Sequence, residues 1–295
     1  MKRFLPLLLV TIAACHESTP ATPSAPPRPR PAAAAVTPQT PEQQVVAWRE
    51  RRKANLLKED GWLSLVGLTW LNPGDNEVKL PAHPPVLARF SLQDGKVTLR
   101  APVKGKPELL RDDTDPSGPQ VVRMGTFRFN VIKRNDRFAL RMKDSEAEAR
   151  TQFQGLEYFP FDPKWRIEAH FEPYNPPHKI SITNVLGMTS EEIAPGAISF
   201  TVDGKPYRLE PILEQGEKDF FIIFKDGTSG KETYGAARYL YATPPGPDGK
   251  IVVDFNKAYN PPCAFTPYAT CPLPPPGNRL PIRIEAGEKK YAGHG

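Results

Sequence analysis

Short runs of β-favouring residues alternate with turn residues along this 295-residue chain from Gly61 onward. Asp-Gly between two such runs is a strong signal for a β-hairpin, and Asp94-Gly95 and Asp203-Gly204 both stand in that position. The chain shows no alternation of strands with long helices. The pattern therefore predicts a mainly β fold, either a single β-sandwich or a barrel-like domain.

The expected strand pairs recur too irregularly to form a sequence repeat. They lie at residues 86–92 with 96–100, 125–133 with 138–143, 198–202 with 206–209 and 220–224 with 233–241, followed by a strand at 250–255. One globular domain over residues 41–292 is the preferred interpretation. Two subdomains joined near residues 144–163 are the alternative.

A helix is expected immediately before these strands, over residues 41 to about 58. Thr40 and Gln43 fit a capping box, and Pro41 suits the first helical position. Val45, Trp48 and Leu56 fall near one face of this helix. The N-terminal helix should therefore pack on the β domain that it precedes.

The N-terminus predicts an exported lipoprotein. Lys2 and Arg3 precede a short apolar run, and Ala13-Ala14-Cys15 resembles the bacterial lipobox, in which the cysteine thiol receives a diacylglycerol. Residues 1–14 are thus predicted to be a lipoprotein signal peptide and Cys15 the lipidated residue, which attaches the chain to a membrane. An ordinary secretory signal that contains a cysteine is the alternative.

Residues 15–40 are predicted to be a Pro/Ala-rich tether between the anchor and the domain. Such a composition cannot build a core and favours extended polyproline II, although proline-rich stretches also serve as docking motifs for partners. We therefore expect a protein anchored in the bacterial cell envelope, with its globular domain in the periplasm or outside the cell.

The charge of the chain does not indicate a nucleic-acid partner. The formal net charge is +6, and the densest basic cluster comprises Arg49, Arg51, Arg52 and Lys53. A solvated helix face accounts for this cluster, with contact to an anionic lipid or polyanion as the alternative. The chain lacks an RNA-binding aromatic motif, so no nucleic acid is expected.

A proline-rich segment after the last expected strand, residues 254–274, is the preferred place for a site, because loops made rigid by proline often carry functional residues. Asp254 and Asn256 would share a face if the strand continued through residue 256. The candidate ligand-binding residues are Arg238, Asp254, Asn256, Tyr259, Asn260 and Tyr268. For Arg238 taken alone, a structural ion pair is preferred over the binding of a carboxylate or phosphate.

Cys263 and Cys271 are predicted to form a disulfide in an oxidising envelope, because they are the only cysteines besides Cys15. Metal ligation and a catalytic thiol are the alternatives. His170 would share a strand face with Glu168 and Glu172, where an exposed polar surface is preferred over a metal site. No metal and no cofactor are expected.

Three motifs together resemble the uncharacterised bacterial family known as domain of unknown function 1684, in a lipoprotein form. They are residues 61–71 (GWLSLVGLTWL), residues 233–240 (TYGAARYL) and residues 254–263 (DFNKAYNPPC) with 271–274 (CPLP). The resemblance extends from about residue 45 to residue 292. It implies no activity and assigns no catalytic or binding residues.

Three classes of function remain open from the sequence, and it does not decide whether the protein is an enzyme. The preferred interpretation is a β domain that binds a small ligand, a glycan or an envelope protein. The second is an envelope hydrolase with a site around Arg238, Asp254, Asn256 and Tyr259. The third is a structural scaffold of the envelope.

Overall fold

The structure is a computed structural model that describes residues 39–80, 86–101, 107–214 and 216–293. Contacts join the described residues from Gln39 onward into one compact unit. The predicted signal peptide, the lipidation site Cys15 and the tether up to residue 38 lie outside the described residues. Within those residues, no helix is long and apolar enough to cross a membrane.

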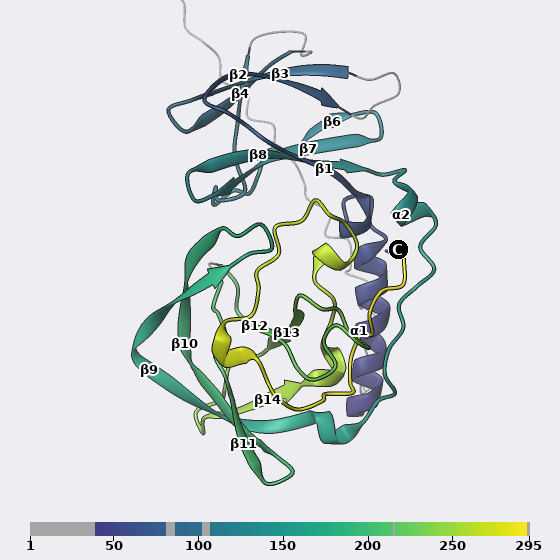
Figure 1. Ribbon diagram of the computed structural model, residues 1–295, viewed down its shortest axis with the longest axis vertical. Coiled ribbons are helices and arrows are strands. Elements are labelled where there is room, and N and C mark those ends of the chain that lie inside the picture. Colours follow the sequence, from purple (N-terminus) through teal and green to yellow (C-terminus); the bar gives the residue numbers. More distant parts are fainter. Residues whose placement is uncertain (1–38, 81–85, 102–106, 215, 294–295) are drawn as a thin grey trace, which may run out of the picture. The chain divides into compact units, whose positions relative to one another are not determined.

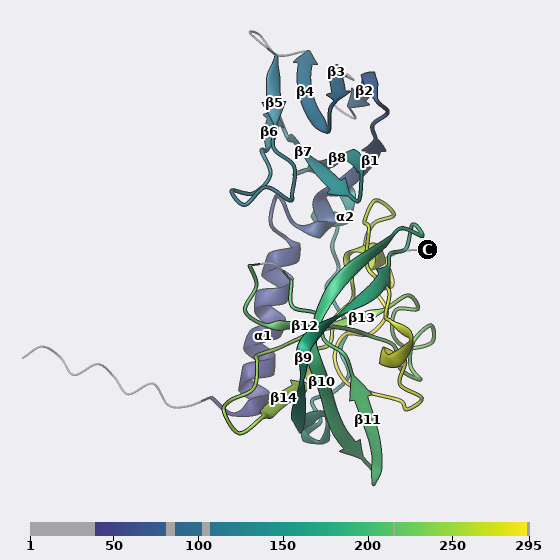
Figure 2. The same cartoon turned by 90° about the vertical axis from the view of Figure 1, so that its left-hand side faces the viewer.

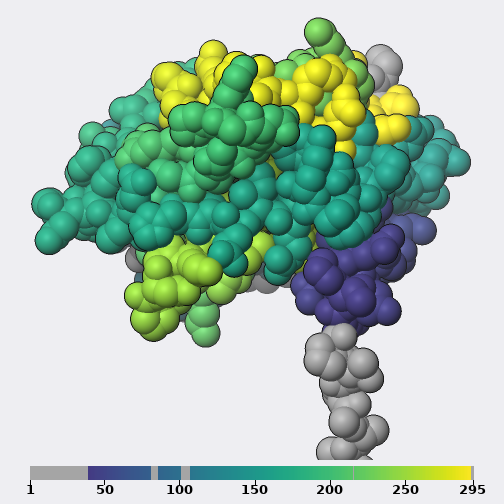
Figure 3. All heavy atoms as spheres, turned by 90° about the horizontal axis from the view of Figure 1, so that it is seen from below, coloured from purple at the N-terminus to yellow at the C-terminus, as the bar shows by residue number. Residues whose placement is uncertain are grey.

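The predicted N-terminal helix is confirmed as α1 (Pro41–Leu56). The Thr40 hydroxyl accepts a hydrogen bond from the Gln43 backbone N–H at 3.2 Å, and the Gln43 side-chain oxygen accepts one from the Thr40 N–H at 2.9 Å. This is the expected capping box, with Pro41 at its start. Val45 and Leu56 are buried, as predicted. Figure 3 shows the first turns of α1, in purple, on the surface of the molecule.

Residues 65–144 form two four-stranded antiparallel sheets, ordered β1-β8-β7-β6 and β2-β3-β4-β5. Their strands are β1 (Leu65–Trp70), β2 (Gly74–Leu80), β3 (Val86–Gln93), β4 (Lys96–Ala101), β5 (Glu108–Leu110), β6 (Val122–Met124), β7 (Phe127–Arg134) and β8 (Arg137–Asp144). Figures 1 and 2 show them as two layers. Phe90 from β3 meets Phe129 from β7 between the layers, with ring centroids 5.6 Å apart.

Residues 151–292 build a second layered arrangement. A sheet ordered β11-β10-β9-β14 contains β9 (Arg166–Thr183), β10 (Thr189–Val202), β11 (Lys205–Leu209) and β14 (Lys250–Asp254), and a two-stranded sheet contains β12 (Phe220–Phe224) and β13 (Arg238–Ala242). Buried Trp165, Phe200, Phe224 and Phe255 belong to one core cluster that both sheets share. All five residues of β12 are buried, so this strand lies inside, whereas the edge strand β14 alternates buried Ile251 and Val253 with exposed Lys250 and Val252.

The short helical elements lie in the connections. They are η1 (Trp62–Ser64), α2 (Glu148–Thr151), η2 (Pro163–Trp165), η3 (Phe255–Lys257), η4 (Pro262–Ala264) and η5 (Pro276–Asn278). The segment that follows η3 and contains η4 and η5 is rich in proline, which fixes φ and removes backbone donors. This composition accounts for a C-terminal segment without long strands.

The prediction of a mainly β fold with an N-terminal helix is confirmed. The predicted hairpin turns are also present, with positive φ at Asp94 (50°), Asn135 (52°) and Asp203 (49°). The described residues hold two large hydrophobic clusters, one from Leu71 to Met142 and one from Trp165 to Ala286. The β-rich part thus packs around two cores, one on each side of residues 144–163.

Candidate functional site

One face of α1 supplies four side chains to a pocket. Trp48, Arg51, Arg52 and Asn55 follow the spacing i, i+3, i+4 and i+7, so a helix places them on the same side. Val45 and Leu56 anchor the helix in the protein interior. The helix is therefore a fixed wall of the pocket and carries both aromatic and cationic groups.

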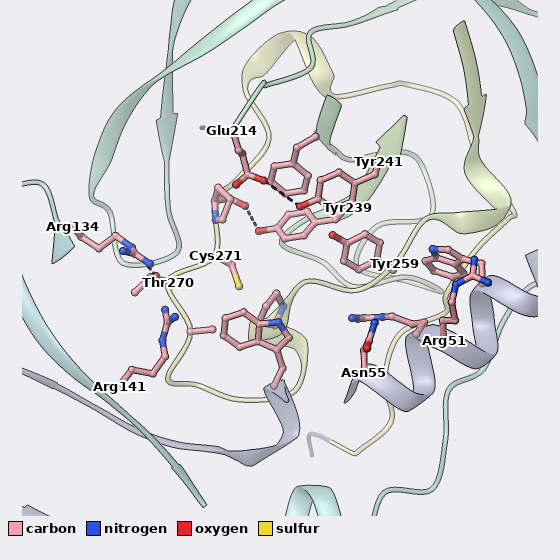
Figure 4. A pocket seen from close by; sticks show the side chains of 17 residues that line it. Arg51, Asn55, Arg134, Arg141, Glu214, Tyr239, Tyr241, Tyr259, Thr270 and Cys271 are labelled. Carbon is pink, nitrogen blue, oxygen red and sulfur yellow. Dashed lines mark hydrogen bonds between the residues drawn. The ribbon is translucent and has the colours of Figure 1, made fainter. Parts of the chain in front are cut away.

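The pocket has a volume of about 570 Å³, and we call it the arginine–tyrosine pocket (Figure 4). It combines four arginines, six aromatic side chains and a single carboxylate. It is lined by Trp48, Arg51, Arg52, Asn55, Trp62, Arg134, Arg141, Glu214, Phe221, Tyr239, Tyr241, Tyr259, Pro262, Ala269, Thr270, Cys271 and Pro272. These residues come from α1, η1, β7, β8, β12, β13, the connection between β11 and β12, and the C-terminal segment.

Strands β12 and β13 supply the aromatic wall. Tyr239 and Tyr241 alternate along β13 and therefore point to the same face. Phe221 pairs with Tyr241 across the ladder, and their rings stack at a centroid distance of 5.0 Å. Tyr259 completes the wall, 5.8 Å from the Tyr239 ring and 6.3 Å from the Tyr241 ring.

The tyrosine hydroxyls hold this wall in place. Tyr239 donates to the Pro272 carbonyl oxygen at 2.9 Å, and Tyr241 donates to Glu214 at 3.2 Å. Burial raises the pKa of the phenols of Tyr239, Tyr241 and Tyr259. All three phenols are therefore neutral at physiological pH, and they present apolar rings with polar ends.

Two of the four arginines are neutralised within the protein. Arg52 donates to Glu288 at 2.9 Å and to the Asn260 carbonyl oxygen at 2.8 Å. Arg134 donates to Asp113 at 2.8 Å and to the Thr270 hydroxyl at 3.3 Å. Both guanidinium groups thus have carboxylate partners and shape the pocket without an unbalanced charge.

Arg141 has no such partner. Its side chain makes no hydrogen bond or ion pair with any residue that the structure describes, and its Nε is buried without an acceptor. Its guanidinium lies 5.3 Å from the Trp62 ring centroid. Burial, and next the charge of Arg134, lower the pKa of Arg141 to about 10, so the side chain stays cationic at neutral pH.

Glu214 is the acidic member of the pocket. Burial raises the pKa of its carboxyl group above the ordinary value, while the hydrogen bond from Tyr241 acts in the opposite direction. Because Arg52 and Arg134 are paired with carboxylates, Arg51 and Arg141 stand against this single carboxylate, and the pocket carries a positive balance at neutral pH. It is therefore suited to an anionic ligand.

Cys271 lies in the wall of the pocket, and Cys263 lies next to it. The Cys263 backbone N–H donates to Cys271 Sγ at 3.0 Å. The predicted disulfide is not formed in this structure, in which both cysteines are free thiols. The chain thus brings the two sulfur-bearing residues together without joining them.

Among the predicted site residues, Tyr259 lines the pocket and Arg238 does not. Arg238 lies between Tyr239 and Ala237 on the opposite face of β13, where it pairs with Asp226 at 3.2 Å. Both of these side chains are buried. The structural ion pair that the sequence favoured for Arg238 is the arrangement observed.

Asp254, Asn256 and Asn260 also serve local structure. Strand β14 ends at Asp254, so the expected alternation through residue 256 is wrong: Asp254 instead accepts from the Asn256 backbone N–H at 3.2 Å at the start of η3. Asn256 exchanges hydrogen bonds with the backbone of Asp162, and Asn260 donates its side-chain amide to the Lys289 carbonyl oxygen at 2.8 Å. The hydrolase residues do not converge on one pocket.

Tyr268 is 38% exposed and is not part of the pocket lining. His170 is exposed on β9, where it pairs with Ser199 on one side and Lys250 on the other. Within the described part of the chain, no group of three or more His, Cys, Asp or Glu side chains could hold a metal ion.

Most residues that line the pocket were not predicted from the sequence. The helical spacing from Trp48 to Asn55 and the alternation of Tyr239 with Tyr241 were signals that could have found two walls. Arg141 has no local signal, because a single arginine on an alternating strand predicts an exposed position. Its place in the pocket depends on contacts between segments far apart in the chain.

A second hollow of about 360 Å³ adjoins the pocket. The two share Arg134, Glu214, Phe221, Thr270 and Pro272 as lining residues. The second hollow continues past the hairpin of β9 and β10 at Asn184 and Ser190. A ligand longer than one ring system could therefore extend from the first space into the second.

Comparisons with known proteins give a relationship without an activity. None of the curated proteins matches the chain. The solution NMR structure of an uncharacterized protein from Haloarcula marismortui is 32% identical, over 49% of this chain and 81% of that chain, with a TM-score of 0.42. The family described as "Protein of unknown function (DUF1684)" matches residues 151–289, and it is to this family that the chain belongs.

Proposed function

We propose that this protein is an envelope lipoprotein whose β domain binds a small organic ligand in the arginine–tyrosine pocket. The observation that supports this proposal is that six aromatic side chains line a space of about 570 Å³. Ligand pockets in proteins typically measure about 300–1,000 Å³ and combine aromatic walls with a few polar groups. A planar apolar ligand would bury its faces against the tyrosines.

A neutral fluorescent probe tests this proposal. N-phenyl-1-naphthylamine is planar and uncharged, and its emission rises when it enters an apolar site. We expect saturable binding of one probe per chain, weakened several-fold by Tyr241→Ala, because that ring is part of the aromatic wall. Tyr241 and Tyr268 are 43% and 38% exposed, which makes Tyr268→Ala a matched control outside the pocket. Unsaturable binding, or equal affinities of the two variants, would refute the function.

The cellular location is part of the same proposal. Cys15 after Ala13-Ala14 supports lipid attachment, and the Pro/Ala-rich residues 15–40 support a tether that holds the domain away from the bilayer. We expect the full chain to fractionate with membranes and a Cys15→Ala variant to lose its acyl chains, as read by intact-protein mass spectrometry. An unacylated wild-type protein would refute the anchor.

We further propose that Cys263 and Cys271 form a disulfide when the protein is in an oxidising compartment. The short distance between the Cys263 amide and the Cys271 sulfur supports this pairing. Thiol–disulfide exchange with glutathione disulfide would supply the oxidant: two thiols become one disulfide, and two glutathione thiols are released. The bond would fix the wall formed by Pro262 and residues 269–272.

A further inference from the structure

Arg141 stands in a different electrostatic situation from the other arginines of the pocket. Arg52 and Arg134 each have a carboxylate within 2.9 Å, and Arg51 lies on the exposed surface of α1. Arg141 is partly buried, with its Nε atom shielded from solvent, yet no described carboxylate pairs with it. A cation that is shielded from water without a counterion costs free energy. An anion that binds to it would therefore gain more binding free energy than an anion at an exposed arginine.

We propose that Arg141 and Thr270 bind an anionic oxygen group of the ligand, such as a carboxylate, sulfonate or phosphate, while the planar part of the ligand lies against the tyrosines. This inference rests on the proposed function and names the chemical class of the ligand. Arg134, whose charge is balanced by Asp113, contributes by orienting Thr270. Glu214 lies away from Arg141 in the pocket, and its carboxylate makes that end less favourable for a negative group.

The guanidinium of Arg141 has the geometry for this task. Its planar fork can donate two parallel hydrogen bonds to the oxygens of one anionic group. Burial and the neighbouring Arg134 lower its pKa, and Asp113, which acts in the opposite direction, pairs with Arg134 and not with Arg141. An anionic ligand would balance the charge of Arg141.

Thr270 lies where it can provide a further donor. Its hydroxyl oxygen accepts from Arg134 Nε at 3.3 Å. A hydroxyl that accepts one hydrogen bond still has its own O–H to donate. An oxygen atom of the ligand could therefore be held by Thr270 and Arg141 together, since both residues line the pocket.

The place of the planar part follows from the arrangement of the aromatic rings. Figure 4 shows Arg134 and Arg141 on one side of the pocket and Tyr239, Tyr241 and Tyr259 on the other. The Trp62 ring, 5.3 Å from the Arg141 guanidinium, lines the space as well. Arg141 thus faces the tyrosines across the pocket, while Arg52 lies over the Tyr259 ring at 4.7 Å, and this arrangement suits a planar organic anion.

Two probes with the same ring system test the assignment. N-phenyl-1-naphthylamine is neutral, whereas 8-anilino-1-naphthalenesulfonate adds one sulfonate to that skeleton. Both are titrated by fluorescence into the full chain and into Arg141→Gln, Arg141→Lys and Thr270→Val. Arg89→Gln is the control, because Arg89 is an exposed arginine on β3 whose loss changes the net charge equally.

We expect Arg141→Gln to weaken the sulfonate probe about tenfold or more and to leave the neutral probe within a factor of two. Arg141→Lys should retain part of the affinity, because it keeps the charge without the planar fork. Thr270→Val should weaken the sulfonate probe several-fold. In the wild type, added NaCl should weaken the sulfonate probe alone, a result that does not depend on the folding of any variant.

Equal affinities of wild type and Arg141→Gln for the sulfonate probe would overturn the inference, and so would an equal loss of both probes. Failure of the neutral probe to bind the wild type would instead overturn the proposed function. Displacement of the sulfonate probe by 1-naphthoate or by 1-naphthyl phosphate then distinguishes a carboxylate from a phosphate as the anionic group of the ligand. Competition by either one supports an anion subsite, and competition by neither contradicts it.

Discussion

The Asp226 carboxylate and the Arg238 guanidinium form an ion pair at 3.2 Å in which both side chains are fully buried. Arg238 also donates to the carbonyl oxygens of Ile284, at 3.0 Å, and of Ala286. Asp226 in turn accepts from the Ile284 backbone N–H at 2.7 Å. The pair therefore ties the segment before β13 to the C-terminal segment.

Removing one partner of this pair should strongly destabilise the protein. Asp226→Asn leaves the Arg238 charge buried without its counterion, which typically costs about 3–5 kcal/mol. We expect a corresponding drop in the free energy of unfolding, measured by urea denaturation. The exposed pair of Arg283 and Glu232, at 2.7 Å, is the control, and Glu232→Gln should change stability little. A similar loss in both variants would contradict the assignment.

The capping box of α1 makes a smaller, separate contribution. Thr40→Ala removes the acceptor for the Gln43 N–H and should lower the free energy of unfolding by about 1 kcal/mol. Thr40→Ser keeps a hydroxyl and should remain close to wild type. The loss should appear in the global transition, because Arg52 ties the helix to buried Glu288. Equal stability of the alanine and serine variants would argue against the cap.

The features that could be predicted from the sequence are those set by neighbouring residues. Asp94-Gly95 and Asp203-Gly204 adopt positive φ because these residues tolerate the left-handed region that tight hairpins need. The capping box depends only on Thr40, Gln43 and the proline between them. Both predictions are confirmed because each structure depends only on residues within four positions of one another in the sequence.

The full length of β9 was not predicted, because Pro173, Pro176 and Pro177 interrupt the pattern of a strand. The ladder with β10 shifts register between Ala194 and Gly196, and residues 174–177 have no partner in it. Pro176 and Pro177 therefore need not donate a ladder hydrogen bond. A strand of 18 residues can thus run through prolines that would normally mark its end.

The site was predicted only in part for a related reason. Arg238 and Tyr239 are neighbours in the sequence, yet alternation along β13 sends Arg238 into the core and Tyr239 to the pocket. The sequence alone does not specify which face of a strand buried on both sides meets a cavity. Arg141 enters the site only through packing between β8, η1 and the C-terminal segment.

The two thiols should differ in reactivity. The hydrogen bond with the Cys271 thiol lowers the pKa of Cys263, and the same interaction, with burial, raises the pKa of Cys271. Cys263 therefore forms the thiolate first as pH rises, and iodoacetamide should modify it before Cys271. Peptide mapping of the reduced protein in a Cys15→Ala background checks this order. Equal rates at the two cysteines would count against it.

Oxidation should join the same pair. After treatment with glutathione disulfide, neither cysteine should react with the alkylating agent under denaturing conditions. The disulfide closes a short loop and should raise the free energy of unfolding by about 2–3 kcal/mol. Cys271→Ser is the matched control, because it cannot form the bond and should stop at a mixed disulfide on Cys263. A stability that oxidation leaves unchanged would show that the bond strains the native loop.

Binding of an anionic ligand should depend on pH through Glu214. Burial raises the pKa of this carboxyl group above its ordinary value of 4.5, so it gains its proton at a higher pH than an exposed glutamate. Tyr241 donates to it, Glu217 and Glu192 lie near enough to act on its charge, and Arg134 lines the same pocket. Lowering the pH from 7 toward 4.5 removes the negative charge of Glu214, while Arg141 stays cationic. The sulfonate probe should therefore bind several-fold more tightly as the pH falls, and the neutral probe should not.

Glu214→Gln should abolish this dependence and bind the sulfonate at pH 7 as tightly as the wild type does at low pH. Glu217→Gln is the matched control outside the pocket, and it should keep the dependence; the same pH profile in Glu214→Gln as in the wild type would assign the effect to another group.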